Sequence, residues 1–207
     1  MAGAMGFGRF VYTPILPGMM EGLGLSASQA GWIASVNYLG YLLGAIGAAY
    51  GWAQGRGRAL GLLGVGGSAV LAALMAMTES FAAFIAIRLL AGIASAFMMV
   101  FLGTVVFARL AAAGRNDLQA LHFGGVGVGI AVSALVTAAL AVTDGTWQAG
   151  WIGAAVLAFI FAASMRPVIA QLPVLERFLG DSCELATIAG FAVVFALVLS
   201  ILLFVLL

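Results

Sequence analysis

Two arginines of this chain lie inside long apolar stretches. Arg9 belongs to the run GFGRFVYTPILP at residues 6–17, and Arg88 belongs to the run FAAFIAIRLLAGIASA at residues 81–96. If these stretches lie in a bilayer, each charge costs about 2.5–3.5 kcal/mol on insertion scales, so it should face a cavity or a partner. Three arrangements would satisfy the guanidinium groups: water in a cavity, nearby backbone carbonyls and hydroxyls, or an anionic ligand.

Polar side chains follow Arg9 at helical spacing. Tyr12 and Thr13 stand three and four residues after it, so the three side chains share one face of a helix. Pro14 and Pro17 remove backbone donors, and we expect them to kink the outer half of this helix. Tyr12 either belongs to a binding site or is an aromatic side chain at a helix interface.

The second apolar stretch carries Asn37, Tyr38 and Tyr41. Tyr38 and Tyr41 share a helix face, and Asn37 lies beside Tyr41. An asparagine in an apolar helix either binds a substrate or donates a hydrogen bond to a neighbouring helix. The residues that we predict to bind a substrate are Arg9, Tyr12, Thr13, Asn37, Tyr41 and Arg88.

The apolar stretches contain no aspartate and no glutamate, and this excludes several kinds of chemistry. A pair of carboxylates for acid–base catalysis is missing. The one histidine, His122, and the one cysteine, Cys183, are far apart and predict neither a metal site nor a nucleophile–base pair. We therefore expect no enzyme, no cofactor and no metal, and a net charge of +1 without a basic face predicts no nucleic-acid partner.

The composition predicts a membrane protein. Of the 207 residues, 65% are hydrophobic and 7% are charged, whereas globular domains are about 45–50% apolar. A helix needs about 20 apolar residues to cross a bilayer, and helices satisfy their own backbone groups there. We therefore predict an all-α polytopic membrane protein with apolar segments at residues 2–20, 27–52, 59–78, 81–108, 121–142, 146–165 and 185–207.

Arginines occur in every second break between these segments. The first, third and fifth breaks hold none, whereas the second, fourth and sixth hold Arg56, Arg58, Arg109, Arg115, Arg166 and Arg177. Positive residues collect in cytoplasmic loops. The alternation therefore predicts a cytoplasmic N-terminus.

The chain divides into three predicted parts. Residues 1–165 hold six segments in two triplets, each with an arginine in its first helix and glycines in its second, as in the inverted repeats of membrane transporters. Residues 166–184 are either an amphipathic helix at the inner surface or a solvated linker. Residues 185–207 are predicted to form a seventh transmembrane helix.

Small residues and tryptophans indicate how the helices pack. Gly40, Gly44 and Gly47 form a stripe on the second segment, and residues 125, 129 and 133 of the fifth have small-xxx-small spacing, so both segments should pack closely. The tryptophans stand at or near segment ends, which is typical of an aromatic belt at the membrane surface. They are Trp32, Trp52, Trp147 and Trp151.

Several stretches together resemble one protein family. The run RLLAGIASA at residues 88–96 resembles the fourth-helix motif of the major facilitator superfamily, with alanine in place of the usual glutamine at position 91. Residues 51–60, with Arg56 and Arg58, stand where that superfamily has its basic gating loop, but the usual acidic residue is absent. The opening GFGRFVYTPILP, residues 30–44 and residues 121–129 resemble the bacterial YbfB/YjiJ-type branch, and the resemblance covers residues 3–165.

The resemblance implies a secondary transporter of the bacterial plasma membrane. Such transporters have twelve helices and a central cavity lined by the first and fourth helices of each half, which Arg9 and Arg88 would face. We expect a six-helix major-facilitator-type half, plus one helix, that moves a small polar or anionic solute by alternating access; a non-transporting scaffold or degenerate fragment is the alternative. The expected partners are the lipid bilayer, a small-molecule substrate, a coupling ion, and a second transporter half or a second copy of the chain.

Overall fold

The computed structural model describes residues 10–50, 57–142 and 146–178, and it describes side chains for residues 10–50, 60–139 and 146–163. Every regular element in these ranges is helical. The elements are α1 (Tyr12–Leu23), α2 (Ala27–Ala49), α3 (Gly57–Ala76), α4 (Phe81–Phe97), a π-helical turn (Met98–Leu102), α5 (Gly103–Ala112), a 3₁₀ turn (Asn116–Leu118), α6 (Gln119–Val142) and α7 (Trp147–Phe178).

The helices coincide with the first six predicted apolar segments. Within the part of the chain that the structure describes, three helical stretches are long and apolar enough to cross a membrane: Ala27–Ala49, Phe81–Ala112 and Asn116–Ala139. Two shorter apolar helices cover Leu60–Ala76 and Trp147–Ala163. The all-helical fold is therefore confirmed, whereas the six-plus-one arrangement stays a prediction because residues 185–207 lie outside the described part.

The first and last described helices extend past the C-terminal limits predicted for them, residues 20 and 165. α1 begins at Tyr12 and continues through Pro17 to Leu23. α7 continues to Phe178, so residue 165 lies within a helix rather than at its end. The division of the chain at residues 165 and 184 stays a prediction.

Local sequence explains the turn between α1 and α2. Gly24 adopts a left-handed conformation with φ of 63°, and its N–H donates to the Met20 carbonyl, which ends α1. The Ser26 side chain then accepts from the Gln29 N–H at 3.2 Å while the Gln29 side chain accepts from the Ser26 N–H at 3.0 Å. This reciprocal capping box begins α2.

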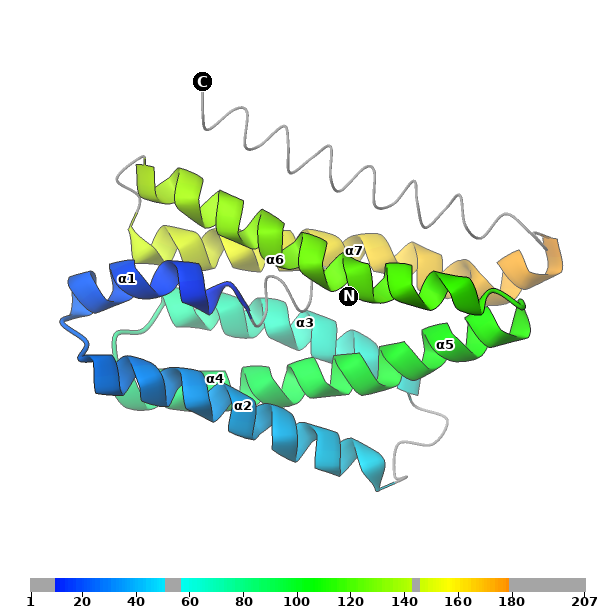
Figure 1. The fold of residues 1–207 in the computed structure, drawn as a ribbon, viewed down its shortest axis with the longest axis horizontal. Coiled ribbons are helices and arrows are strands. Elements are labelled where there is room, and N and C mark those ends of the chain that lie inside the picture. The colour runs from blue at the N-terminus through cyan, green and yellow to red at the C-terminus, as the bar shows by residue number, and fades with distance from the viewer. Residues whose placement is uncertain (1–9, 51–56, 143–145, 179–207) are drawn as a thin grey trace.

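The helices run back and forth along the long axis of the bundle (Figure 1). α4 packs against α2 and α3, α3 also packs against α7, and α1 and α6 both contact α7. The C-terminal ends of α2 and α5 lie at one end of the bundle with the N-terminal ends of α3 and α6 (Figure 1). Arg109 and Arg115 therefore lie at one end, and Glu21 and Glu79 at the other, as the alternation of arginines in the breaks requires.

Glycines let α2 and α4 approach until their backbones touch. A Cβ added to Gly92 would overlap the Asn37 carbonyl oxygen, and one added to Gly40 would overlap the Leu89 carbonyl oxygen. A Cβ on Gly44 would lie 2.8 Å from the Ala96 Cβ. The prediction of close packing is thus confirmed for Gly40 and Gly44.

The glycine prediction fails at one position. A Cβ on Gly47 would meet nothing within 4 Å, so this glycine is not needed for the α2–α4 contact.

The small residues of α6 are also placed by the structure. The residues at positions 125, 129 and 133, which were predicted to allow close packing, are all buried.

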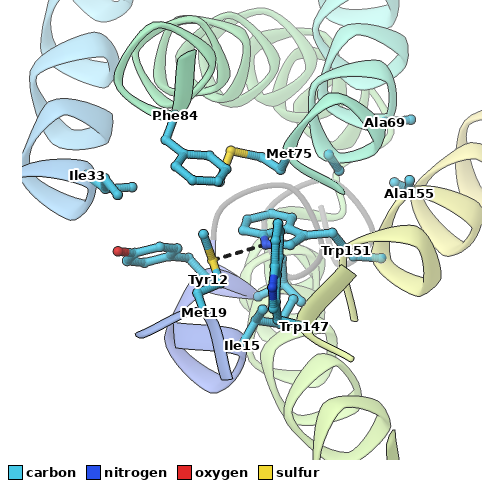
Figure 2. Packing of buried hydrophobic residues seen from close by; sticks show 14 residues of the cluster. Tyr12, Ile15, Met19, Ile33, Ala69, Met75, Phe84, Trp147, Trp151 and Ala155 are labelled. Atoms are coloured by element: carbon cyan, nitrogen blue, oxygen red, sulfur yellow. Dashed lines mark hydrogen bonds between the residues drawn. The ribbon is translucent and has the colours of Figure 1, made fainter. Parts of the chain in front are cut away.

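The main hydrophobic core joins α1, α3, α4 and α7, with Ile33 added from α2 (Figure 2). Met19, Met75 and Phe84 are fully buried there, and the Trp151 Nε1–H points to the Met19 sulfur at 3.3 Å. Gly150 of α7 makes room for α1, because a Cβ at this position would lie only 3.0 Å from the Ile15 side chain. This core fixes the position of α1.

The predicted aromatic belt is wrong for two of its members. Trp147 and Trp151 are 8% and 1% exposed and pack in the core, and the Trp147 ring meets the Phe84 ring edge to face at 6.1 Å. Trp32 is 62% exposed, as a belt residue would be. Trp52 lies outside the described residues.

A π-helical turn interrupts the long stretch formed by α4 and α5. The turn covers Met98–Leu102, and the Thr104 hydroxyl donates to the carbonyl of Val100 at 2.6 Å, with the Phe101 carbonyl at 3.0 Å. The hydroxyl thereby satisfies backbone carbonyls where the regular α-helical pattern is broken.

Candidate functional site

α1, α2 and α4 meet around a cavity. Its volume is about 40 Å³, and its lining comes from the start of α1 with Phe10 before it, the first half of α2 and the middle of α4. The lining residues are Phe10, Tyr12, Thr13, Ala34, Asn37, Tyr38 and Arg88.

Arg88 brings a positive charge to the wall of this cavity. The residue is 3% exposed, and its guanidinium carbon lies 4.8 Å from the centre of the Tyr12 ring. A guanidinium group over an aromatic ring at this distance is a cation–π interaction, which gains strength where water is excluded.

The Tyr12 hydroxyl ties α1 to α2. It donates to the Ala30 carbonyl at 2.9 Å, and the side chain is 3% exposed. The ring also lies 6.4 Å from the Trp151 ring of α7. Tyr12 therefore joins three helices and supports Arg88 at the same time.

Asn37 ties α2 to α4 at the level of Arg88. Its Nδ2 donates to the Arg88 backbone carbonyl at 2.9 Å, and the residue is 2% exposed. This bond lies beside the glycine contact between the two helices, since the Asn37 carbonyl faces Gly92. Of the two roles considered for Asn37, the structure shows the interhelical hydrogen bond.

Four of the six predicted binding residues thus come together at one cavity: Tyr12, Thr13, Asn37 and Arg88. Tyr41 does not line it and instead packs against Val65 and Met98. Arg9 lies outside the described residues. Their role in binding stays a prediction.

The gating role of Arg56 and Arg58 stays a prediction. Arg56 lies outside the described residues, and only the backbone of Arg58 is described, in the first turn of α3.

Sequence reasoning missed three lining residues: Phe10, Ala34 and Tyr38. The sequence did contain an indication for Tyr38, because this residue follows Asn37 directly and shares a broad helix face with Tyr41. Phe10 and Ala34 are apolar like their neighbours, so nothing in their residue type distinguishes them.

His122 lies away from this cavity, at the arginine-bearing end of the bundle. Its ring meets the Phe107 ring edge to face at 5.4 Å and the Phe123 ring at 5.8 Å. Among the residues that the structure describes, no group of three histidines, cysteines or acids could hold a metal ion.

The sequence profile of a family described as "Uncharacterised MFS-type transporter YbfB" matches residues 1–179. The chain belongs to this family. The match confirms the predicted resemblance to YbfB-type members of the major facilitator superfamily, and it extends over the helices that form the cavity. A search of curated proteins found no match to the chain.

Family membership agrees with the helical architecture of this chain. Its apolar helices are those of a multi-pass membrane protein, and its cavity lies between the helices that carry the arginine motif and the opening motif. Members of the superfamily move solutes and are not enzymes in general, in line with the lack of paired carboxylates in the apolar segments.

Proposed function

We propose that this chain forms at least part of a secondary transporter that moves a small anionic solute across the bacterial plasma membrane, with Arg88 as a charge contact for that solute. The observation that carries the proposal is the Arg88 guanidinium group, which is buried and lines a cavity with Tyr12, Thr13 and Asn37. Arg9, on the same apolar run as Tyr12, is proposed as a second charge contact.

Charge balance favours an anion over a cation or a neutral solute. The apolar segments contain no acidic side chain, and Arg88 is the charged side chain of the described cavity lining. A cation entering the cavity would be repelled, whereas an anion would offset the cost of holding a guanidinium group in a bilayer. A guanidinium group also presents five N–H donors in a plane that matches a carboxylate.

Movement of the solute requires a second wall that can open and close the cavity. We propose that a second transporter half, or a second copy of this chain, supplies that wall, and that the helices then rock around the bound solute. A coupling ion would drive accumulation. In this arrangement the arginine-bearing end of the bundle faces the cytoplasm.

Uptake of radiolabelled organic anions into proteoliposomes tests the proposal. We expect uptake by the unmodified chain and its loss in Arg88→Ala and Arg9→Ala. Arg115→Ala is the matched control, because Arg115 pairs with Asp117 at 3.1 Å on the exposed surface and should transport normally. Unchanged uptake in both cavity variants would remove the binding role, and no uptake by any chain would favour a non-transporting scaffold.

A further inference from the structure

The cavity between α1, α2 and α4 is small and mostly lined by polar side chains. Its volume is about 40 Å³, and the polar members of its lining are Tyr12, Thr13, Asn37, Tyr38 and Arg88. One water molecule needs roughly 10–15 Å³ on this scale together with polar partners, whereas purely apolar cavities stay dry. The size and the lining therefore fit a cluster of about three water molecules.

Side chains from two helices can bind this water. Asn37 Nδ2 donates to the Arg88 carbonyl at 2.9 Å, and an amide group can form up to about four hydrogen bonds. The Tyr12 hydroxyl donates to the Ala30 carbonyl at 2.9 Å, and its oxygen can also accept. Thr13 adds a hydroxyl that both donates and accepts. The Tyr12 hydroxyl points away from Trp151 and the apolar core (Figure 2), so the polar and apolar sides of α1 are separate.

We infer that the cavity holds a small cluster of ordered water molecules that bridges Thr13 of α1 to Asn37 of α2. The water supplies the donors and acceptors that lipid lacks, which lowers the cost of placing polar side chains within apolar helices. This inference goes beyond the proposed function, because a non-transporting bundle would need the same water. A solute that enters the site has to displace it.

Hydroxyl-radical labelling of the full chain in detergent tests the inference, with X-ray radiolysis of water as the radical source and mass spectrometry as the readout. The radicals react close to where they form, so a buried ring is modified quickly where water lies beside it. Tyr12 is 3% exposed, and the core residues Trp151 and Phe84 are 1% and 0% exposed. We expect Tyr12 to be modified several-fold faster than Trp151 and Phe84, although all three side chains are almost fully buried.

Variants show whether this modification depends on the cavity. Ala34→Val adds two methyl groups to the lining, so it should displace water and lower the rate at Tyr12 to that at Trp151. Ala49→Val is the matched control, because Ala49 is exposed on the same helix and is not part of the lining, and the rate at Tyr12 should stay unchanged.

A second variant removes a water ligand without filling the cavity. Thr13→Val keeps the shape of the side chain and removes its hydroxyl, so the rate at Tyr12 should fall. Because Thr13 is exposed, this variant should fold even if Ala34→Val does not, and it then decides the question alone. Melting temperatures check the fold of each variant.

Two results would overturn the inference. If Tyr12 of the unmodified chain reacts as slowly as Trp151, the cavity is dry. If Tyr12 reacts quickly in the unmodified chain and equally quickly in both Ala34→Val and Thr13→Val, the radicals come from bulk solvent rather than from water held in the cavity.

Discussion

The guanidinium carbon of Arg88 lies 4.8 Å from the centre of the Tyr12 ring, so a charge on α4 rests on an aromatic side chain of α1. The ring is itself fixed by the Tyr12 hydroxyl, which bonds to α2. Three helices are therefore linked through two side chains at the wall of the cavity. A change in either side chain should alter both the stability of the bundle and the placement of the charge.

Tyr12 should have two separable contributions. Tyr12→Phe keeps the ring under Arg88 and removes the hydroxyl bond, so we expect a loss of about 0.5–1.5 kcal/mol in stability. Tyr12→Leu also removes the cation–π contact and should cost about 0.5–2 kcal/mol more. Denaturation of each variant in detergent measures the two steps, with Tyr50→Phe as the exposed control. Equal losses in the two Tyr12 variants would contradict the stabilising role of the ring.

Gly92 should tolerate no side chain. Gly92→Ala would place a methyl group against the backbone of α2, where the Tyr41 nitrogen lies 2.7 Å from the added Cβ. We expect a loss of about 1–3 kcal/mol or more, because a backbone cannot move aside as a flexible side chain can. In the control Gly31→Ala, the added Cβ meets nothing within 4 Å, and stability should stay equal or rise. The melting temperature should therefore fall in Gly92→Ala and stay equal or rise in Gly31→Ala.

Trp151 should be the most sensitive of the described tryptophans. Trp151→Ala leaves a cavity among α1, α3, α4 and α7 and removes the contact with the Met19 sulfur, so we expect a loss of about 3–5 kcal/mol. Trp32→Ala, on the exposed face of α2, should change stability far less. Urea or thermal denaturation compares the two, and similar losses would argue against a core that is centred on α7.

The two ends of the bundle should face opposite sides of the membrane. In a Cys183→Ala background, Arg115→Cys should react with a membrane-impermeant maleimide only from the cytoplasmic side, and Glu79→Cys only from the outer side. Both positions are exposed in the turns that join helices, so neither substitution disturbs the core. Labelling of both from the same side would refute the predicted topology.

The positions of the helices could be predicted, because the hydropathy and length of the apolar stretches determine where helices form. Tyr12, Thr13, Asn37 and Arg88 could also be singled out, since a polar group in an apolar segment needs a partner. Whether such a residue faces a ligand or a neighbouring helix depends on how the helices cross, and Asn37 shows the second outcome.

Other features could not be read from residue type. Tyr38 and Tyr41 stand on neighbouring parts of one helix face, and the close α2–α4 contact decides that Tyr38 lines the cavity while Tyr41 packs toward α3 and the π turn. Trp147 and Trp151 carry the amphipathic rings that suit a membrane surface, yet the same rings fill the core once α7 packs against α1 and α3. In both cases tertiary packing selects between positions that the sequence leaves equivalent.

The π turn at Met98–Leu102 has a consequence for how the gene can vary in length. A wider turn holds one residue more than an α turn, so losing one residue there would restore a regular helix and keep both flanking halves in register. A loss anywhere else in α4 or α5 would rotate all later positions by about 100° and turn apolar side chains away from their neighbours. Among related chains, we expect single-residue insertions and deletions in this stretch to collect within these five positions.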